Sequence, residues 1–334
     1  MENTITSKIR TILELNEDES ELMNQLRRQV DEYEFDSGLT KESKTISELY
    51  KENLKAALGP PEDNNIIKSG FTDLDNMIGG FLPGEFVVLG ELACMGVNLF
   101  QINLALNISK TVPVQFFVFK YSANYITRKF MAALSGIQQS GIRLDYLIEA
   151  DKQKLLSLES EMTSRKIFIN DNCINSLLSL KKHCLQQIKN HGVKVIFVDF
   201  IQLMSTERDR KKREHEISYI SRELKNFARE NDVCIIAASY LSKDAEKRAL
   251  KGKMPQLSDL KKFGSLEQEA DKVIFLYRHS YYMIRKDKDG NKIGEKTTLI
   301  IAKNRSGPCD NVWISRIYGY SSFTDYNEAR NIVK

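Results

Sequence analysis

The chain has 334 residues, 42% of them hydrophobic, which is enough to bury one large core and leave a smaller appendage. A formal net charge of +4 excludes a polycation, so any nucleic-acid surface must be local. The five cysteines are scattered, and there is neither a signal-peptide pattern nor an apolar run of membrane-spanning length, so we expect free thiols in a cytoplasmic protein without membrane contact.

Three parts follow one another along the chain. Residues 1–44 are polar, with a few apolar residues at helical spacing, and predict a helical or partly disordered extension that cannot fold alone. Residues 45–61 predict an amphipathic helix that stops at a Gly-Pro-Pro breaker. Residues 62–334 are assigned to the main domain.

Within the main domain, apolar β-branched segments alternate with helical patterns. Such alternation predicts an α/β fold, with a mostly parallel twisted sheet and helices on both faces. The expected strands are residues 86–89, 114–119, 166–169, 193–198, 233–238, 272–276 and 298–302.

Residues 84–100, GEFVVLGELACMGVNLF, have the strand, loop and helix order of a phosphate-binding loop. In a working G-x-x-x-x-G-K-[ST] loop the backbone amides hold the phosphates, the lysine reaches the β- and γ-phosphates, and the hydroxyl holds Mg²⁺. Here Gly96 keeps the second glycine position. The first glycine, the lysine and the hydroxyl are replaced by Glu91, Val97 and Asn98. A carboxylate repels phosphates and valine carries no charge, so the loop is predicted to be degenerate and to have lost tight ATP binding.

Other motifs stand in the order and spacing of one family. They are SGFTDLD at 69–75, VIFVDFIQLM at 195–204, LSDL at 257–260 with GSLEQEAD at 264–271, and IIAKNRSGP at 300–308. Together they resemble the C-terminal motor domain of the DnaB-type replicative DNA helicases over residues 45–325. The resemblance implies a RecA-like P-loop NTPase fold, ATP and Mg²⁺ as cofactors, single-stranded DNA as ligand, and a hexameric ring in DNA replication.

The resemblance also bears on the N-terminal parts. In that family a helix at the place of residues 45–61 leaves its own subunit and docks on a neighbour, and packing on its own domain is the alternative. The larger N-terminal domain of the family is expected to be missing, because about 40 residues cannot replace it.

Catalysis in that family uses a glutamate after the second strand and a γ-phosphate-sensing glutamine after the fifth, and this chain has Lys120 and Tyr240 there. Asp199, the Walker B aspartate, is kept, although it could persist as a structural residue. Because four positions are lost together, Val97 and Asn98 among them, we expect a pseudo-ATPase acting as an accessory or partner subunit of a helicase ring. The alternatives are a divergent but active ATP-dependent 5′–3′ helicase and, less favoured, a plain single-strand binder.

Lys303 and Arg305 match the K-x-R segment that carries the arginine finger in that family. Such a finger stabilises charge on the γ-phosphate held by a neighbouring subunit. Two interpretations stay open. The pair is either residual ancestry in a basic turn, or a finger offered in trans to an active DnaB-type helicase or a second copy.

A basic cluster after the Walker B strand predicts contacts with the phosphates of single-stranded DNA. Its residues are Arg208, Arg210, Lys211, Lys212 and Arg213, joined by Arg248 from the next expected channel loop. Acidic residues interleave with the cluster, so solvated surface is the alternative. The sequence predicts no metal site apart from the nucleotide's Mg²⁺.

Overall fold

The computed structural model describes residues 25, 43–59, 65–143, 146–172, 175–206, 212–242, 244–248, 254–284, 286, 296–317 and 321–326. Contacts divide the chain into two units, Met1–Asn64 and Asn65–Lys334, which are described separately. Within these described ranges, no helix is long and apolar enough to cross a membrane.

The first unit contains helix α3 (Ile46–Leu58). The Glu48 carboxylate accepts hydrogen bonds from the backbone N–H and the hydroxyl of Thr45, at 2.7 and 2.8 Å, and so caps the first turn. Apolar side chains of α3 are exposed, with Ile46 at 82% and Tyr50 at 63%. Helix α3 lies within residues 45–61, for which the sequence predicts an amphipathic docking helix, and residues 60–61 lie outside the described residues.

The second unit is built on a sheet whose described strands number nine, in the order β3-β2-β4-β5-β1-β6-β7-β8-β9. The parallel part consists of β3 (Ile167–Asn170), β2 (Val114–Val118), β4 (Val195–Asp199), β5 (Cys234–Tyr240), β1 (Phe86–Glu91) and β6 (Lys272–Arg278). The antiparallel part consists of β7 (Lys296–Asn304), β8 (Asn311–Ile317) and β9 (Ser322–Asp325). The mostly parallel sheet and all seven expected strands are confirmed, and β8 and β9 are additional.

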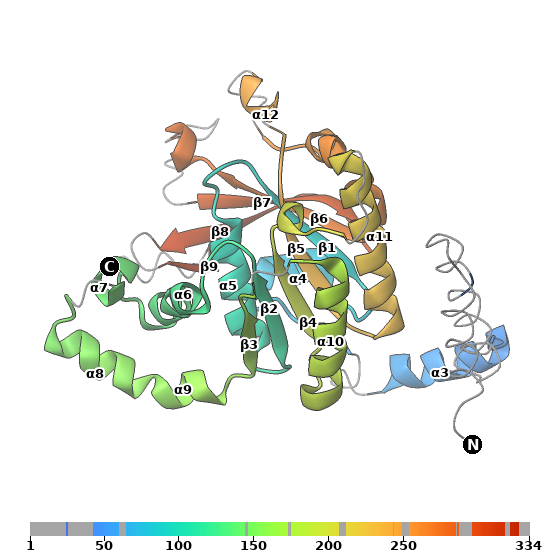
Figure 1. Cartoon of the computed structure of the whole chain (residues 1–334), viewed down its shortest axis with the longest axis horizontal. Coiled ribbons are helices and arrows are strands. Elements are labelled where there is room, and N and C mark those ends of the chain that lie inside the picture. The colour runs from blue at the N-terminus through green and yellow to red at the C-terminus, as the bar shows by residue number, and fades with distance from the viewer. Residues whose placement is uncertain are drawn as a thin grey trace. The chain divides into compact units, whose positions relative to one another are not determined.

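Helices cover both faces of the sheet, as right-handed crossovers between parallel strands require. Helices α5 (Val97–Ile108) and α6 (Ala123–Ser135) lie on one side, and α10 (Leu177–His191) and α11 (Arg213–Glu230) lie on the other (Figure 1). Ten of the twelve residues of α5 are buried, because the helix packs between the sheet and the segments that carry β9 and α6. Packing therefore fixes the position of α5, including its N-terminus, which is the part that binds phosphate in a phosphate-binding loop.

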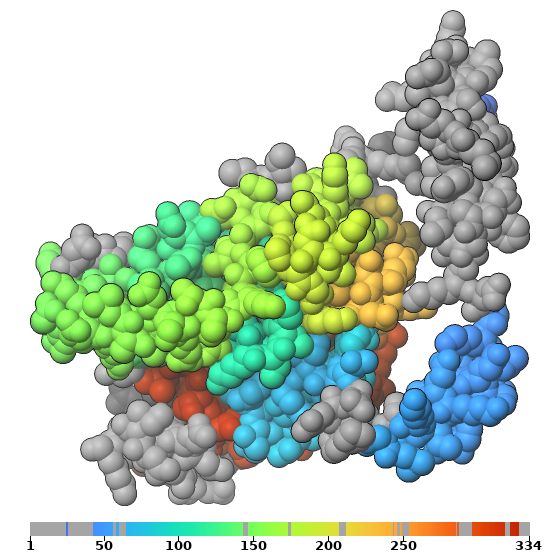
Figure 2. All heavy atoms as spheres, turned by 90° about the horizontal axis from the view of Figure 1, so that it is seen from below, coloured from blue at the N-terminus to red at the C-terminus, as the bar shows by residue number. Residues whose placement is uncertain are grey.

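Shorter elements complete the unit. They are α4 (Thr72–Ile78), α7 (Gln139–Arg143), α8 (Glu149–Ser157), α9 (Glu159–Ser164), α12 (Asp244–Lys247), α13 (Leu266–Glu269), and the 3₁₀ turns η2 (Ile201–Leu203), η4 (Leu257–Phe263) and η5 (Ser280–Tyr282). Helices α8 and α9 have no buried residue and lie on the outer surface (Figure 2).

One tight turn depends on a glycine. Gly264 follows η4 with φ +74° and ψ −143°, a conformation that L side chains rarely adopt. A Cβ atom placed there would lie 2.0 Å from Ser218 Oγ and 2.5 Å from the Glu214 carbonyl oxygen. This turn is thus closed directly against α11.

Candidate functional site

The loop between β1 and α5 binds its own carboxylate. Gly96, with φ +103°, precedes the first turn of α5 and lets the loop approach it. The Glu91 Oε2 atom accepts hydrogen bonds from the N–H groups of Gly96 at 2.6 Å and Val97 at 2.7 Å. Free N–H groups at a helix N-terminus form a natural anion site. In this structure those two donors are not available to a phosphate, because Glu91 occupies them.

Burial shapes the charge of Glu91, whose residue is only 7% exposed. Desolvation raises the pKa of its carboxyl, while the two amide hydrogen bonds and, more weakly, the charge of Lys129 lower it. The charge of Asp199 opposes ionisation as well. Glu91 is therefore a buried acid whose ionised form depends on the amides and on a nearby cation.

That cation, Lys129 of α6, is a site residue that the sequence did not predict. Its ammonium donates a hydrogen bond to Asn98 Oδ1 at 2.7 Å. It also lies 5.2 and 5.1 Å from the ring centres of Tyr121 and Tyr125, which stack on each other. Burial lowers the pKa of Lys129, and the charges of Asp199 and Glu91 raise it. The positive charge missing at Val97, a fully buried side chain, thus comes from another helix.

Asp199 ends β4 and is fully buried. Neither of its carboxylate oxygens has a hydrogen-bond partner among the described residues, and the same holds for Asn98 Nδ2. Burial raises the pKa of Asp199 to about 6, although Asn98 lies near enough to lower it, as do the charges of Lys129 and Lys120. No hydrogen bond of normal geometry joins Asn98 to Asp199, so we treat the carboxylate as unsatisfied.

The two other positions singled out from the sequence, Lys120 and Tyr240, lie near the site carboxylates. Lys120 is exposed and lies 5.6 Å from the Tyr121 ring centre, so it is Lys129 and not Lys120 that faces Glu91. Tyr240, at the end of β5, stacks on Phe200 with ring centres 3.8 Å apart. Burial, followed by the charges of the two site carboxylates, raises the pKa of Tyr240 to about 12, so its hydroxyl stays neutral.

The predicted finger residues lie at the opposite end of the strands from Glu91. Lys272, at the start of β6, pairs with Asn304 on β7 and lies level with Val87 on β1. Glu91 is four residues further along β1, which corresponds to roughly 13 Å at the usual strand rise. Arg305 follows β7 at this far end, so it cannot serve the loop of its own chain without a rearrangement of the sheet.

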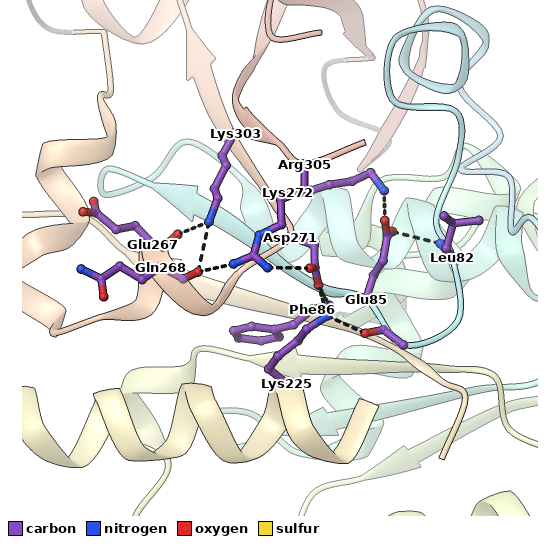
Figure 3. Close-up of polar contacts among 11 residues, drawn as sticks. Leu82, Glu85, Phe86, Lys225, Glu267, Gln268, Asp271, Lys272, Lys303 and Arg305 are labelled. Atoms are coloured by element: carbon purple, nitrogen blue, oxygen red, sulfur yellow. Dashed lines mark hydrogen bonds and ion pairs between the residues drawn. The ribbon is translucent and has the colours of Figure 1, made fainter. Parts of the chain in front are cut away.

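Backbone carbonyls hold both finger side chains (Figure 3). The Lys303 ammonium donates to the carbonyls of Glu267 and Gln268 at 2.7 and 3.1 Å, and Arg305 donates to Gln268 at 2.6 Å. Arg305 is also 3.7 Å from Asp271, and its side chain remains 50% exposed. Burial and the charge of Arg305 lower the pKa of Lys303. The guanidinium is thus positioned but still accessible.

Two ion pairs with little solvent exposure lie at the start of β6, next to the finger residues (Figure 3). Asp271 accepts from the Lys225 ammonium at 2.6 Å and from the Phe86 N–H at 2.8 Å. Lys272 pairs with Glu85, and the two side chains are 1% and 9% exposed. Charges removed from water in this way stabilise only while both partners are present.

Part of the predicted DNA-binding cluster lies outside the described residues, namely Arg208, Arg210 and Lys211. Lys212 is exposed at the start of α11. Arg213 pairs with Glu216 and donates to the carbonyls of Gln202 and Met204 at 2.7 and 2.6 Å. Arg213 therefore fastens the loop to α11.

Arg248 also makes contacts within the chain. It forms a two-pronged pair with Asp259 at 2.7 and 2.8 Å and donates to the Met254 carbonyl at 3.0 Å. The described part of the chain contains no group of three or more His, Cys, Asp or Glu side chains that could hold a metal ion.

Comparisons with known proteins agree with this architecture. Residues 66–325 match the family described as DnaB-like helicase C terminal domain. The replicative DNA helicase DnaB of Geobacillus stearothermophilus is 32% identical over 292 residues, which cover 86% of this chain and 63% of that protein. The replicative DNA helicase DnaC of Bacillus subtilis (strain 168) is 32% identical over 262 residues, covering 78% and 56%. The chain thus spans less than two thirds of the length of these relatives.

Solved structures confirm the RecA-like fold. One of them, described as an ATPase domain, superposes with a TM-score of 0.75 at 32% identity, covering 85% of this chain and 99% of that domain. A DnaB-like replicative helicase, described with its interactions with primase, gives a TM-score of 0.76 at 29% identity, covering 96% and 76%. The resemblance inferred from the motifs is therefore correct, and the chain belongs to the DnaB-like helicase family.

Proposed function

We propose that this chain acts in DNA replication as a partner subunit of a DnaB-type helicase ring and does not hydrolyse ATP. The observation that carries the proposal is the seat of the Glu91 carboxylate on the N–H groups of Gly96 and Val97. A nucleotide phosphate needs these same donors. It would have to displace a buried carboxylate and then remain beside it.

The chemistry of the remaining positions points the same way. Val97 offers no cation to the β- and γ-phosphates. Lys120, an exposed cation, stands where the family has the base that prepares the attacking water. A lysine cannot accept a proton from water in its usual charged state. The residues present therefore do not fit ATP with its Mg²⁺.

The finger supports a role in trans. Arg305 lies at the far end of the sheet from its own loop, half exposed and held by the Gln268 carbonyl and the Asp271 carboxylate. Such a guanidinium suits a phosphate held by another subunit, where an arginine finger contributes on the order of 10³ to 10⁵ in rate. The exposed apolar side chains of α3 would dock on a neighbour in the same assembly.

Single-stranded DNA is the proposed ligand. The guanidinium groups of Arg213 and Arg248 make contacts within the chain. Among the described members of the cluster, the exposed Lys212 is therefore the best candidate for a phosphate contact. Binding would weaken with salt in proportion to the number of phosphates contacted.

A second candidate function is an active helicase with an unconventional loop. The observation in its favour is that Asp199 is kept at the end of its strand with both oxygens unsatisfied among the described residues. A carboxylate of that kind is a ready partner for a cation or a water molecule.

The deciding experiment measures DNA-stimulated ATP hydrolysis by the chain alone and mixed with an active DnaB-type helicase from the same cell. We expect no hydrolysis by the chain alone, and a changed rate in the mixture that disappears with Arg305→Ala. Hydrolysis by the chain alone, above the level of an Asp199→Ala control, would establish the second candidate.

Nucleotide binding gives an independent measurement. Glu91→Gly restores the residue type of a working loop and frees the two amides. We expect ATP binding by calorimetry to be undetectable for the unaltered chain and measurable for this variant. Equal binding by both chains would contradict the proposed block.

A further inference from the structure

The ammonium of Lys129, on α6, reaches the first turn of α5 beside the closed loop. It donates to Asn98 Oδ1 at 2.7 Å, and the stacked rings of Tyr121 and Tyr125 lie beside it at 5.2 and 5.1 Å. Its charge acts on Glu91 and on Asp199. One side chain thus links the residue after the replaced lysine to both buried carboxylates.

We propose that Lys129 is the resident cation of this site, which holds Glu91 on the amides and keeps the loop and α5 in place without nucleotide or Mg²⁺. In a nucleotide-bound loop the phosphates are neutralised by the loop lysine and the metal ion. Here the anion is a carboxylate of the chain itself, so the counter-charge is supplied by the chain as well. The inference rests on the closed loop of the proposed function.

Three features of the surroundings support this role. Asp199 is fully buried and lacks a hydrogen-bond partner among the described residues, so its charge depends on a neighbouring cation. The tyrosine rings keep water from Lys129 and stabilise its charge through their faces. Lys120, the other cation that acts on Asp199, is exposed and therefore screened.

The test is a thermal melt without nucleotide. Lys129→Met keeps most of the length of the side chain and removes the charge, and Lys120→Met is the matched control. We expect Lys129→Met to lower the melting temperature by on the order of 10 °C, because it removes the buried cation that acts on both buried carboxylates. Lys120→Met should change it by about 2 °C or less, and Lys129→Arg should restore most of the loss. Equal effects of the two methionine substitutions would overturn the proposal.

A double-mutant cycle separates charge from packing. Glu91→Gln removes the negative charge and keeps an oxygen that can accept the two amide hydrogen bonds. Added to Lys129→Met, it should recover a large part of the lost melting temperature. Strict additivity would overturn the proposal, since Lys129 would then act through packing alone. If Lys129→Met does not fold, recovery of a folded chain in the double variant supports the proposal and its failure overturns it.

Magnesium provides the last arm. Millimolar Mg²⁺ alone should leave the melting temperature of the unaltered chain unchanged, because Lys129 already supplies the positive charge. A rise that Asp199→Asn abolishes would overturn the proposal. None of these melts depends on ATP hydrolysis. Hydrolysis by the unaltered chain would therefore refute the proposed function, whereas the role of Lys129 would still be decided by the double-mutant cycle.

Discussion

Asp199→Asn should stabilise the protein at neutral pH. The substitution keeps the shape of the side chain and removes a charge that is fully buried without a hydrogen-bond partner among the described residues. Burial raises the pKa of Asp199 from 3.8 to about 6 in the folded chain. Because the folded chain holds this proton more tightly than the unfolded chain, stability is lost as the pH rises through this interval.

The size of the effect follows from the same shift. A difference of about two pKa units corresponds to roughly 3 kcal/mol of lost stability above pH 6. The asparagine amide brings hydrogen-bond donors of its own into the buried site, and a donor without a partner there offsets roughly 1 to 2 kcal/mol. We therefore expect a net gain of about 1 to 2 kcal/mol for the variant at pH 8.

Urea denaturation at pH 8 and at pH 3.5 measures this gain. It should be present at pH 8 and nearly absent at pH 3.5, where the aspartate is protonated in the folded chain and mostly protonated in the unfolded chain. Asp310→Asn, at an exposed position, is the control and should show neither effect. A variant that is less stable than the unaltered chain at pH 8, or a gain that persists at pH 3.5, would refute the reasoning.

Three further changes test other parts of the structure by the same denaturation assay. Lys272→Met leaves a buried carboxylate without its partner and should cost about 3 to 5 kcal/mol, whereas a cost below about 1 kcal/mol would mean that the pair is solvated. Gly264→Ala should cost at least about 2 kcal/mol more than Gly79→Ala, because both glycines have positive φ but only the first would drive its Cβ into α11. Equal losses of stability in the two variants would show that the positive φ alone, and not the contact with α11, sets the cost. Arg305→Ala should change stability by less than about 1 kcal/mol, since its side chain is half exposed, and a larger loss would disqualify it as a clean probe of the finger.

The sequence predicted most of the parallel strands well because they are apolar runs buried on both faces, whereas the edge strand β3 is half-buried along its length. β4, for example, is buried at every position. β8 was missed because it is an antiparallel strand in which exposed Asn311 and Trp313 alternate with buried Val312 and Ile314. That two-residue period is a usable signal, but it is short and weakly apolar.

The order of the phosphate-binding loop and its replaced positions could be predicted, but the contacts of Glu91 could not. A glutamate at the first glycine position predicts repulsion of phosphate, whereas its turn back onto the amides depends on the path of the loop. Lys129 was beyond the sequence for a similar reason, because its place depends on how α6 packs beside α5. The one local hint is that Lys129 follows Tyr125 by four residues and shares its helix face.

Arg305 lies at the far end of the strands from Glu91, so the two ends of the sheet present different groups to neighbouring subunits. In the proposed role, one side of such a subunit offers the Arg305 guanidinium to a neighbour, and the other side holds no nucleotide that a neighbour's arginine could reach. In a closed ring, each copy would therefore inactivate the junction at its own Glu91 loop. The junction on its Arg305 side would remain intact. The ratio of such copies to ordinary subunits would then set, in simple proportion, the fraction of subunit junctions that hydrolyse ATP.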